Sequence, residues 1–285
     1  MSSSTAEAHA TPTESNPRAP ATPRAALATL TRPHPTVWVI TVTVGEDNRM
    51  TGDAMDEVSC HLDTAESEWR EAGGGKTGSK IGGALVLTSG NAKFFCNGLG
   101  LPEQNVEGFM LNQWEPLKYR LLTYPLLTIA AINGHAFGGG CLVAMTCDLR
   151  LMTSGKGMLS INEVLIGVIL SRNDMELLKA KITPPHGRPW PMRDVVLGKR
   201  FTQAEALDIG LIDEIVDDGG DRARLVARAV ERGAVEGQVV SGGAYGLLKE
   251  GIFQHLQEKG QFPRPRNNPG LMEARWRTRM KYAKL

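Results

Sequence analysis

The sequence predicts an α/β fold with a helical C-terminal part. Short apolar stretches with the composition of buried strands recur along the chain, at Thr36 to Val44, Ala84 to Thr88, Leu126 to Ile132 and Leu149 to Met152. Segments with the 3.6-residue spacing of helices separate them, and helical segments predominate beyond Ser171. Strands that alternate with helical crossovers are typical of a parallel sheet covered by helices.

Each helical segment is predicted from its apolar spacing or from its end signals. The spacing of Met55, Val58, Leu62 and Ala65 predicts a helix over 50–71. Further helices are expected over 106–122, from the glycines 138–140 onward, over 191–197 and over 202–207, the last stopped by Gly210. We expect three parts: a leader without fixed structure (1–33), rich in Ala, Pro, Ser and Thr, an α/β core (34–216) and a helical C-terminal part (217–285).

Composition and charge disfavour several classes of function. The 32 Lys and Arg residues nearly balance the 31 Asp and Glu residues, which argues against a protein that binds nucleic acid by neutralising phosphates. No apolar run approaches the roughly 20 residues that cross a bilayer, so we expect no membrane span. The four cysteines form no CxxC pair and the histidines no HExxH pair, which predicts reduced thiols and no metal site.

A glycine-rich segment, Gly73 to Gly78, has the GxGxxG spacing of dinucleotide-binding loops and also contains GKT. Its context fits neither nucleotide motif, because it follows a helix and precedes a strand. A phosphate loop also requires glycine where this chain has Arg70. The segment is therefore predicted to be a surface loop.

Two other glycine turns each follow a predicted strand. One is Asn97-Gly98-Leu99-Gly100, and the other is Gly138-Gly139-Gly140, which immediately precedes a helix. Glycines let the main chain approach a ligand closely, and a helix N-terminus favours negative charge. One amide from each turn could therefore form an oxyanion hole, although either turn alone is equally well explained by tight packing.

Together with Cys147-Asp148-Leu149-Arg150 and Asn162 to Gly167, these turns resemble the crotonase superfamily, also called the enoyl-CoA hydratase/isomerase family, over about residues 36 to 216. The resemblance implies a crotonase-like ββα spiral core and an acyl-CoA substrate, with coenzyme A as part of the substrate and no separate cofactor. It places the two N–H donors for the thioester oxygen at Leu99 and Gly139, beside Gly98 and Gly138. Most members carry Asp where this chain has Gly100.

The family's hydratases carry two glutamates, at positions that are Leu142 and Glu163 in this chain. In having only one of these two glutamates, this chain resembles the Δ3,Δ2-enoyl-CoA isomerases, which move a double bond without adding water. The resemblance implies that Glu163 takes a proton from C2 and returns it at C4, with Leu142 and Leu165 as an apolar lining that raises its basicity.

The other polar candidates near these motifs receive lesser roles. Lys93 and Phe95 are expected to contact substrate, with Lys93 facing a CoA phosphate or, equally, only solvent. Three other polar residues are expected to have structural roles and not catalytic ones. We expect His135 to be packed, Asp148 to support a turn and Asp174 to be a charge at a helix N-terminus.

The chain ends in Ala283-Lys284-Leu285, which resembles the peroxisomal Ser-Lys-Leu signal and predicts a peroxisomal location and an import receptor as partner. The family resemblance implies a homotrimer or hexamer. The alternatives are an enoyl-CoA hydratase or acyl-CoA thioester hydrolase of the same superfamily, or a non-catalytic acyl-CoA-binding subunit. Gly100 and the proline-rich insert at 184–191 motivate the last alternative.

Overall fold

The computed structural model describes residues 25–100, 102, 106–182 and 191–260, with side chains to residue 256. Most of the expected leader, most of the proline-rich insert and the C-terminal tripeptide lie outside the described residues.

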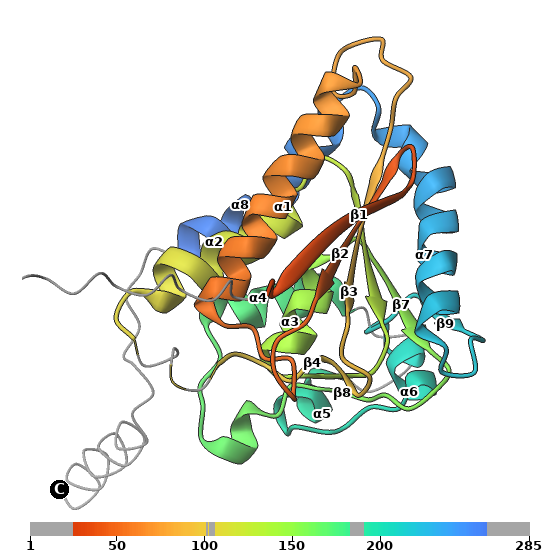
Figure 1. Ribbon diagram of the computed structural model, residues 1–285. Coiled ribbons are helices and arrows are strands. Elements are labelled where there is room, and N and C mark those ends of the chain that lie inside the picture. Colours follow the sequence, from red (N-terminus) through yellow and green to blue (C-terminus); the bar gives the residue numbers. More distant parts are fainter. Residues whose placement is uncertain (1–24, 101, 103–105, 183–190, 261–285) are drawn as a thin grey trace, which may run out of the picture.

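A six-stranded main sheet forms the centre of the fold (Figure 1). Its order is β1-β2-β3-β5-β7-β9, and every neighbouring pair is parallel except β1 and β2. The strands are β1 (Ala28–His34), β2 (Val37–Val42), β3 (Ala84–Ser89), β5 (Leu127–Ile132), β7 (Leu149–Thr153) and β9 (Glu214–Val216). β3 and β5 are buried on both faces, which explains their continuous apolar sequences.

A second, smaller sheet carries the connections that matter for the site. It consists of β4 (Phe94–Cys96), β6 (His135–Phe137) and β8 (Leu159–Ser160), parallel and in that order. The sequence did not predict these strands, because two or three residues are too few to show a period of apolar side chains.

Helices cover the main sheet on both sides. Figure 1 shows α7 and α1 flanking it, with α7 packed against β3 and β5 and α1 against β1 and β2. The helical elements are α1 (Gly52–Glu71), the π-helical η2 (Met110–Trp114), α2 (Glu115–Leu122), α3 (Gly139–Thr146), the 3₁₀ turn η3 (Glu163–Ile166), α4 (Arg172–Lys181), α5 (Met192–Val196), α6 (Gln203–Asp208), α7 (Arg222–Glu236), the 3₁₀ turn η4 (Gly237–Val240) and α8 (Ala244–Gly260). No helix among the described ranges is long and apolar enough to cross a membrane.

The predicted strands and helices of the core are confirmed, with the apolar face of α1 buried as expected. The glycine-rich segment after α1 is a loop that leads to β3, also as predicted. The leader prediction is wrong for residues 28–33, which belong to β1. Pairing with β2 satisfies their backbone groups, and the N–H groups of Leu27 and Ala28 donate to the Glu57 carboxylate at 2.7 and 2.8 Å. α7, expected in a separate C-terminal part, covers the core sheet.

Gly140 permits the close contact between α3 and the small sheet. Substitution of Gly140 therefore tests this contact directly. A Cβ at Gly140 would lie 2.1 Å from the carbonyl oxygen of Cys96, whereas one at Gly251 in α8 would meet nothing within 4 Å. We expect Gly140→Ala to lower the free energy of unfolding by about 1–3 kcal/mol, because backbone must move to make room. The matched change Gly251→Ala should raise it by about 0.5–1 kcal/mol through helix propensity.

Denaturant titration of both variants measures these changes. A Gly140→Ala protein as stable as the unsubstituted chain would contradict the packing described for α3.

Candidate active site

Three segments that end strands of the small sheet come together at one edge. Gly98 and Leu99 follow β4, Gly138 and Gly139 follow β6, and Glu163 follows β8. Because the three strands are parallel neighbours, their carboxyl ends lie on the same side. The distances agree with this arrangement: a Cβ built on Gly139 would lie 3.4 Å from the Leu99 nitrogen, and one on Gly138 would lie 2.9 Å from Glu163 Oε1.

The loop that carries Leu99 is fastened through its backbone to the segment before α1. The Gly98 carbonyl accepts from the Met50 N–H at 2.9 Å, and the Gly100 N–H donates to the Met50 carbonyl at 3.0 Å. Arg49 Nη1 also donates to the Leu99 carbonyl at 3.2 Å. These bonds hold the loop although Gly100 replaces the family's aspartate, and no sequence signal pointed to Met50 or Arg49.

These bonds also orient the Gly98–Leu99 peptide. None of the described peptide bonds is cis, so the Leu99 N–H points away from the Gly98 carbonyl, which Met50 fixes. Asp47 supports the arrangement by accepting from Arg49 Nε at 2.7 Å and from Asn97 Nδ2 at 3.1 Å.

The second turn presents the Gly139 N–H at the start of α3. The Gly138 N–H donates to the Ser160 carbonyl at 2.8 Å, and the Gly138 carbonyl accepts from the Leu142 N–H at 3.1 Å. Gly138 has φ 53°, ψ −124°, a conformation that side chains strongly disfavour. The Gly139 N–H therefore lies in the first turn of a helix, where backbone N–H groups lack intrahelical partners and the helix dipole favours negative charge.

Glu163 begins η3 and is 9% exposed. Its Oε2 is buried and has no hydrogen-bond partner among the described residues, and its backbone carbonyl accepts from the Val168 N–H at 2.9 Å. Burial raises the pKa of the Glu163 carboxyl to about 7, and the negative charge of Asp174 acts in the same direction. A carboxyl group with this pKa can accept and return a proton near neutral pH.

Asp174 is a paired charge at the N-terminus of α4, as predicted. It completes a capping box with Ser171, and its carboxylate forms a buried ion pair with Lys118 of α2. Glu115 joins the same network, because it accepts from Lys118 Nζ at 3.1 Å and from Asn173 Nδ2 at 3.1 Å. No sequence signal pointed to Lys118, because its pairing with Asp174 joins helices far apart in the chain.

Two side chains predicted to contact substrate lie at opposite extremes of exposure. Phe95 is 4% exposed in the core, and its carbonyl accepts from Asn48 Nδ2 at 2.7 Å. Leu165 is 64% exposed, with its side chain turned toward Gly198, so it does not desolvate Glu163. Leu142 is buried in α3 as expected. The prediction that Leu165 desolvates Glu163 is wrong because η3 turns its side chain outward.

Lys93 lies at the start of β4, where it is exposed and its Nζ is 5.0 Å from the ring centroid of Phe94. His135 stacks on Phe137 at 5.1 Å and contacts Phe94 at 5.6 Å, so it is a packed imidazole, as predicted. Burial lowers the pKa of His135, and the charges of Lys93 and Arg200 lower it further. The turn support expected of Asp148 is also present, because its Oδ2 accepts from the N–H and hydroxyl of Thr128 at 2.9 and 3.0 Å.

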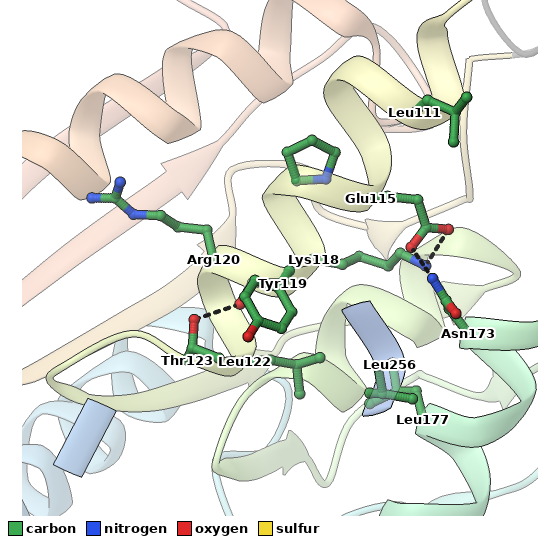
Figure 2. Close-up of a pocket in the computed structure, with 11 residues that line it drawn as sticks. Leu111, Glu115, Lys118, Tyr119, Arg120, Leu122, Thr123, Asn173, Leu177 and Leu256 are labelled. Carbon is green, nitrogen blue, oxygen red and sulfur yellow. Dashed lines mark hydrogen bonds and ion pairs between the residues drawn. The ribbon is translucent and has the colours of Figure 1, made fainter. Parts of the chain in front are cut away.

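A pocket of about 490 Å³ lies between α2, α4 and α8 (Figure 2). Leu111, Leu122, Leu177 and Leu256 supply apolar surface, and Glu115, Lys118 and Asn173 form a polar wall. Lys118 also pairs with Asp174, whose charge acts on Glu163, so the pocket borders the network beside the site. The residues come from three separate stretches of sequence, which is why periodicity could not reveal the pocket.

Comparison with known proteins gives a consistent result. A family model described as enoyl-CoA hydratase/isomerase matches residues 76–245. Enoyl-CoA delta isomerase 2, peroxisomal, of Arabidopsis thaliana is 26% identical over 232 residues, which cover 77% of this chain and 90% of the relative. Enoyl-CoA delta isomerase 1, mitochondrial, of Rattus norvegicus is 34% identical over 152 residues, covering 51% of this chain and 50% of the relative.

Among solved structures, an enoyl-CoA hydratase from Mycobacterium marinum matches with a TM-score of 0.67 at 25% identity, covering 82% of this chain and 94% of its own. This match confirms the predicted α/β fold of the crotonase type.

The buried state of Glu163 predicts a dependence of stability on pH. Its pKa is raised from 4.5 to about 7 on folding, so the folded state binds more protons than the unfolded state between these values. The free energy of unfolding should therefore fall as pH rises through this window, by up to roughly 3 kcal/mol. Glu163→Gln keeps the shape without the ionisation and should remove this component.

Denaturant titrations at pH 5 and pH 8 measure the difference. Glu231→Gln, whose side chain is 67% exposed in the unsubstituted protein, serves as the matched control and should leave the pH dependence unchanged. Identical pH dependence in the Glu163→Gln and unsubstituted proteins would contradict the desolvation of Glu163.

Proposed function

Because the chain belongs to the enoyl-CoA hydratase/isomerase family, we propose that it moves the double bond of a 3-enoyl-CoA to the 2 position, as a Δ3,Δ2-enoyl-CoA isomerase. The observation that carries the proposal is the single buried carboxylate beside two glycine turns whose amides approach each other. Isomerase names among the relatives support the same reading.

In this mechanism the N–H groups of Leu99 and Gly139 bind the thioester oxygen. The Glu163 carboxylate removes a proton from C2, and the electrons of that C–H bond pass into a dienolate whose negative charge lies on the oxygen. The same carboxyl group then returns the proton at C4, which leaves the double bond between C2 and C3. Donors placed where charge develops stabilise the transition state, and loss of one typically costs about 2.7–4 kcal/mol.

The raised pKa of Glu163 suits this double use. A carboxyl group of ordinary acidity holds a proton too weakly to be an effective base, whereas one with a pKa of about 7 is matched to neutral pH. The pocket between α2, α4 and α8 supplies apolar surface for an acyl chain beside the same network.

Hydration needs a water to be activated while a partner group supplies the complementary proton. The second family position for a glutamate is Leu142, which is 2% exposed and cannot exchange a proton. This residue disfavours hydratase activity. Hydratase or thioester-hydrolase activity stays the alternative within the family, since the Mycobacterium marinum structure is described as a hydratase; a non-catalytic acyl-CoA-binding subunit is the third.

The test is conversion of cis and trans 3-enoyl-CoA substrates by purified protein, followed by product identification. We expect 2-enoyl-CoA, with kcat/KM rising as pH increases through about 7, because the free enzyme acts with Glu163 ionised. Glu163→Gln should lower kcat/KM by about 10²–10⁴, and Glu231→Gln should leave it unchanged. Formation of 3-hydroxyacyl-CoA would select hydration, free thiol would select hydrolysis, and binding without turnover would select a silent subunit.

We also propose a peroxisomal location, reached through an import receptor that recognises Ala283-Lys284-Leu285. One relative is named as peroxisomal and another as mitochondrial, so the tripeptide is the feature that supports this choice. Assembly as a homotrimer or hexamer stays a prediction from the family.

A fluorescent protein fused to the N-terminus tests the location. The fusion should coincide with a peroxisomal marker, deletion of residues 283–285 should disperse it, and Ala283→Ser should retain it because serine restores the common signal. Localisation that is unchanged by the deletion would contradict the proposal.

A further inference from the structure

Lys181 ends α4 at a place where positive groups outnumber carboxylates. Its side chain is half-buried, with Nζ donating to the Cys147 carbonyl at 3.1 Å and lying 5.3 Å from the ring centroid of Phe253 in α8. The charged and titratable groups that act on it are Arg150 of β7, Asp148 and the Cys147 thiol just before β7, and Lys249 of α8.

Among the described residues, the one carboxylate that acts on Lys181 is Asp148, and it already has other partners. Asp148 Oδ2 accepts from Lys249 Nζ at 2.9 Å and from two groups of Thr128. Arg150 has its own partner, with Nη2 2.8 Å from an Asp213 oxygen. Lys181 is therefore the cation of this cluster that makes no ion pair within the described part of the chain.

A half-buried ammonium group that contacts a carbonyl and an aromatic ring, but no carboxylate, loses its proton more readily than one in an ion pair. Burial lowers the pKa of Lys181 to about 8, with further lowering by Arg150 and Lys249, although Asp148 and the Cys147 thiol oppose the shift. A desolvated lysine with such neighbours has a sizeable neutral fraction near physiological pH, and the neutral amine is a nucleophile.

We propose that Lys181 is an acylation site, at which its amine takes the acyl group from an acyl-CoA thioester. The nitrogen attacks the thioester carbonyl carbon, a C–N bond forms, the C–S bond breaks, and the amine proton leaves so that the products are an amide and the free thiol of coenzyme A. The site lies on α4 and needs neither Glu163 nor the two glycine turns. It rests on the proposed function only in that this function brings acyl-CoA to the protein.

Lys179 provides an internal control. It lies two residues away on the same helix, its side chain is 51% exposed, and its Nζ pairs with Glu176 at 3.2 Å. Proteolytic cleavage after Glu176 and next to Asp194 gives one peptide that contains both Lys179 and Lys181. Mass spectrometry of this peptide compares the acylation of the two lysines directly.

The experiment incubates the full chain with acetyl-CoA over pH 6.5–9.5 and follows acetylation of both lysines. We expect Lys181 to react at least about tenfold faster than Lys179 at pH 7.5, because desolvation and two neighbouring cations favour its neutral, nucleophilic form, whereas Lys179 is exposed and paired with a carboxylate. Its rate should approach a plateau above about pH 8. Equal rates, or slower reaction of Lys181, would overturn the proposal.

Two variants separate this site from the isomerase site. Lys181→Arg should lose the fast adduct while Lys179 still reacts slowly. Glu163→Gln should lose isomerase activity and retain the fast adduct, so failure of the isomerase assay leaves the acylation result interpretable. Loss of the adduct in Glu163→Gln would show that acylation depends on the active site and would refute a separate site on α4.

Discussion

The carboxyl ends of the small sheet meet because main chain passes close to main chain there, with no side chain between. At the carboxyl end of β4, a Cβ at Gly140 would lie 2.1 Å from the Cys96 carbonyl oxygen. The same close approach recurs at the amino ends of the strands, where a Cβ at Gly134 would lie 2.2 Å from the Lys93 carbonyl oxygen. Both contacts join the β6 and α3 region to β4. A side chain at Gly140 would separate the two turns, and the amides of Leu99 and Gly139 would no longer approach each other.

The same close packing determines the state of Glu163. Gly138 lies against Oε1, and Oε2 is buried without a hydrogen-bond partner among the described residues. The charged form therefore loses hydration, and the one backbone hydrogen bond from Glu163 itself offsets only part of that loss. The fold tolerates this cost because the main sheet and its helices bury a large continuous core. Burial makes the ionised carboxylate less stable and more basic. Such a loss of folding stability in favour of activity is common at active sites.

The sequence was sufficient to predict an element where its residue type has a single physical explanation. Continuous apolar runs predicted β3 and β5, and glycine turns next to strands predicted Gly98 and Gly138. It was insufficient where structure depends on distant partners. The small sheet has strands too short for a period, and the anchoring of Leu99 by Arg49 crosses fifty positions of sequence. Leu165 was misplaced because its direction depends on the tight turn η3.

The difference between the two family reactions then rests on one position of α3. Isomerisation moves a single proton along one face of the substrate, so one carboxyl group can serve as base and then as acid. Hydration adds the elements of water across the double bond, and a second polar group has to position or protonate the incoming atoms. Leu142 is buried and apolar where that group would stand, whereas Glu163 has the acidity that a shared base and acid requires. The proposed isomerisation therefore depends on the missing carboxylate in α3 as much as on the carboxylate in η3.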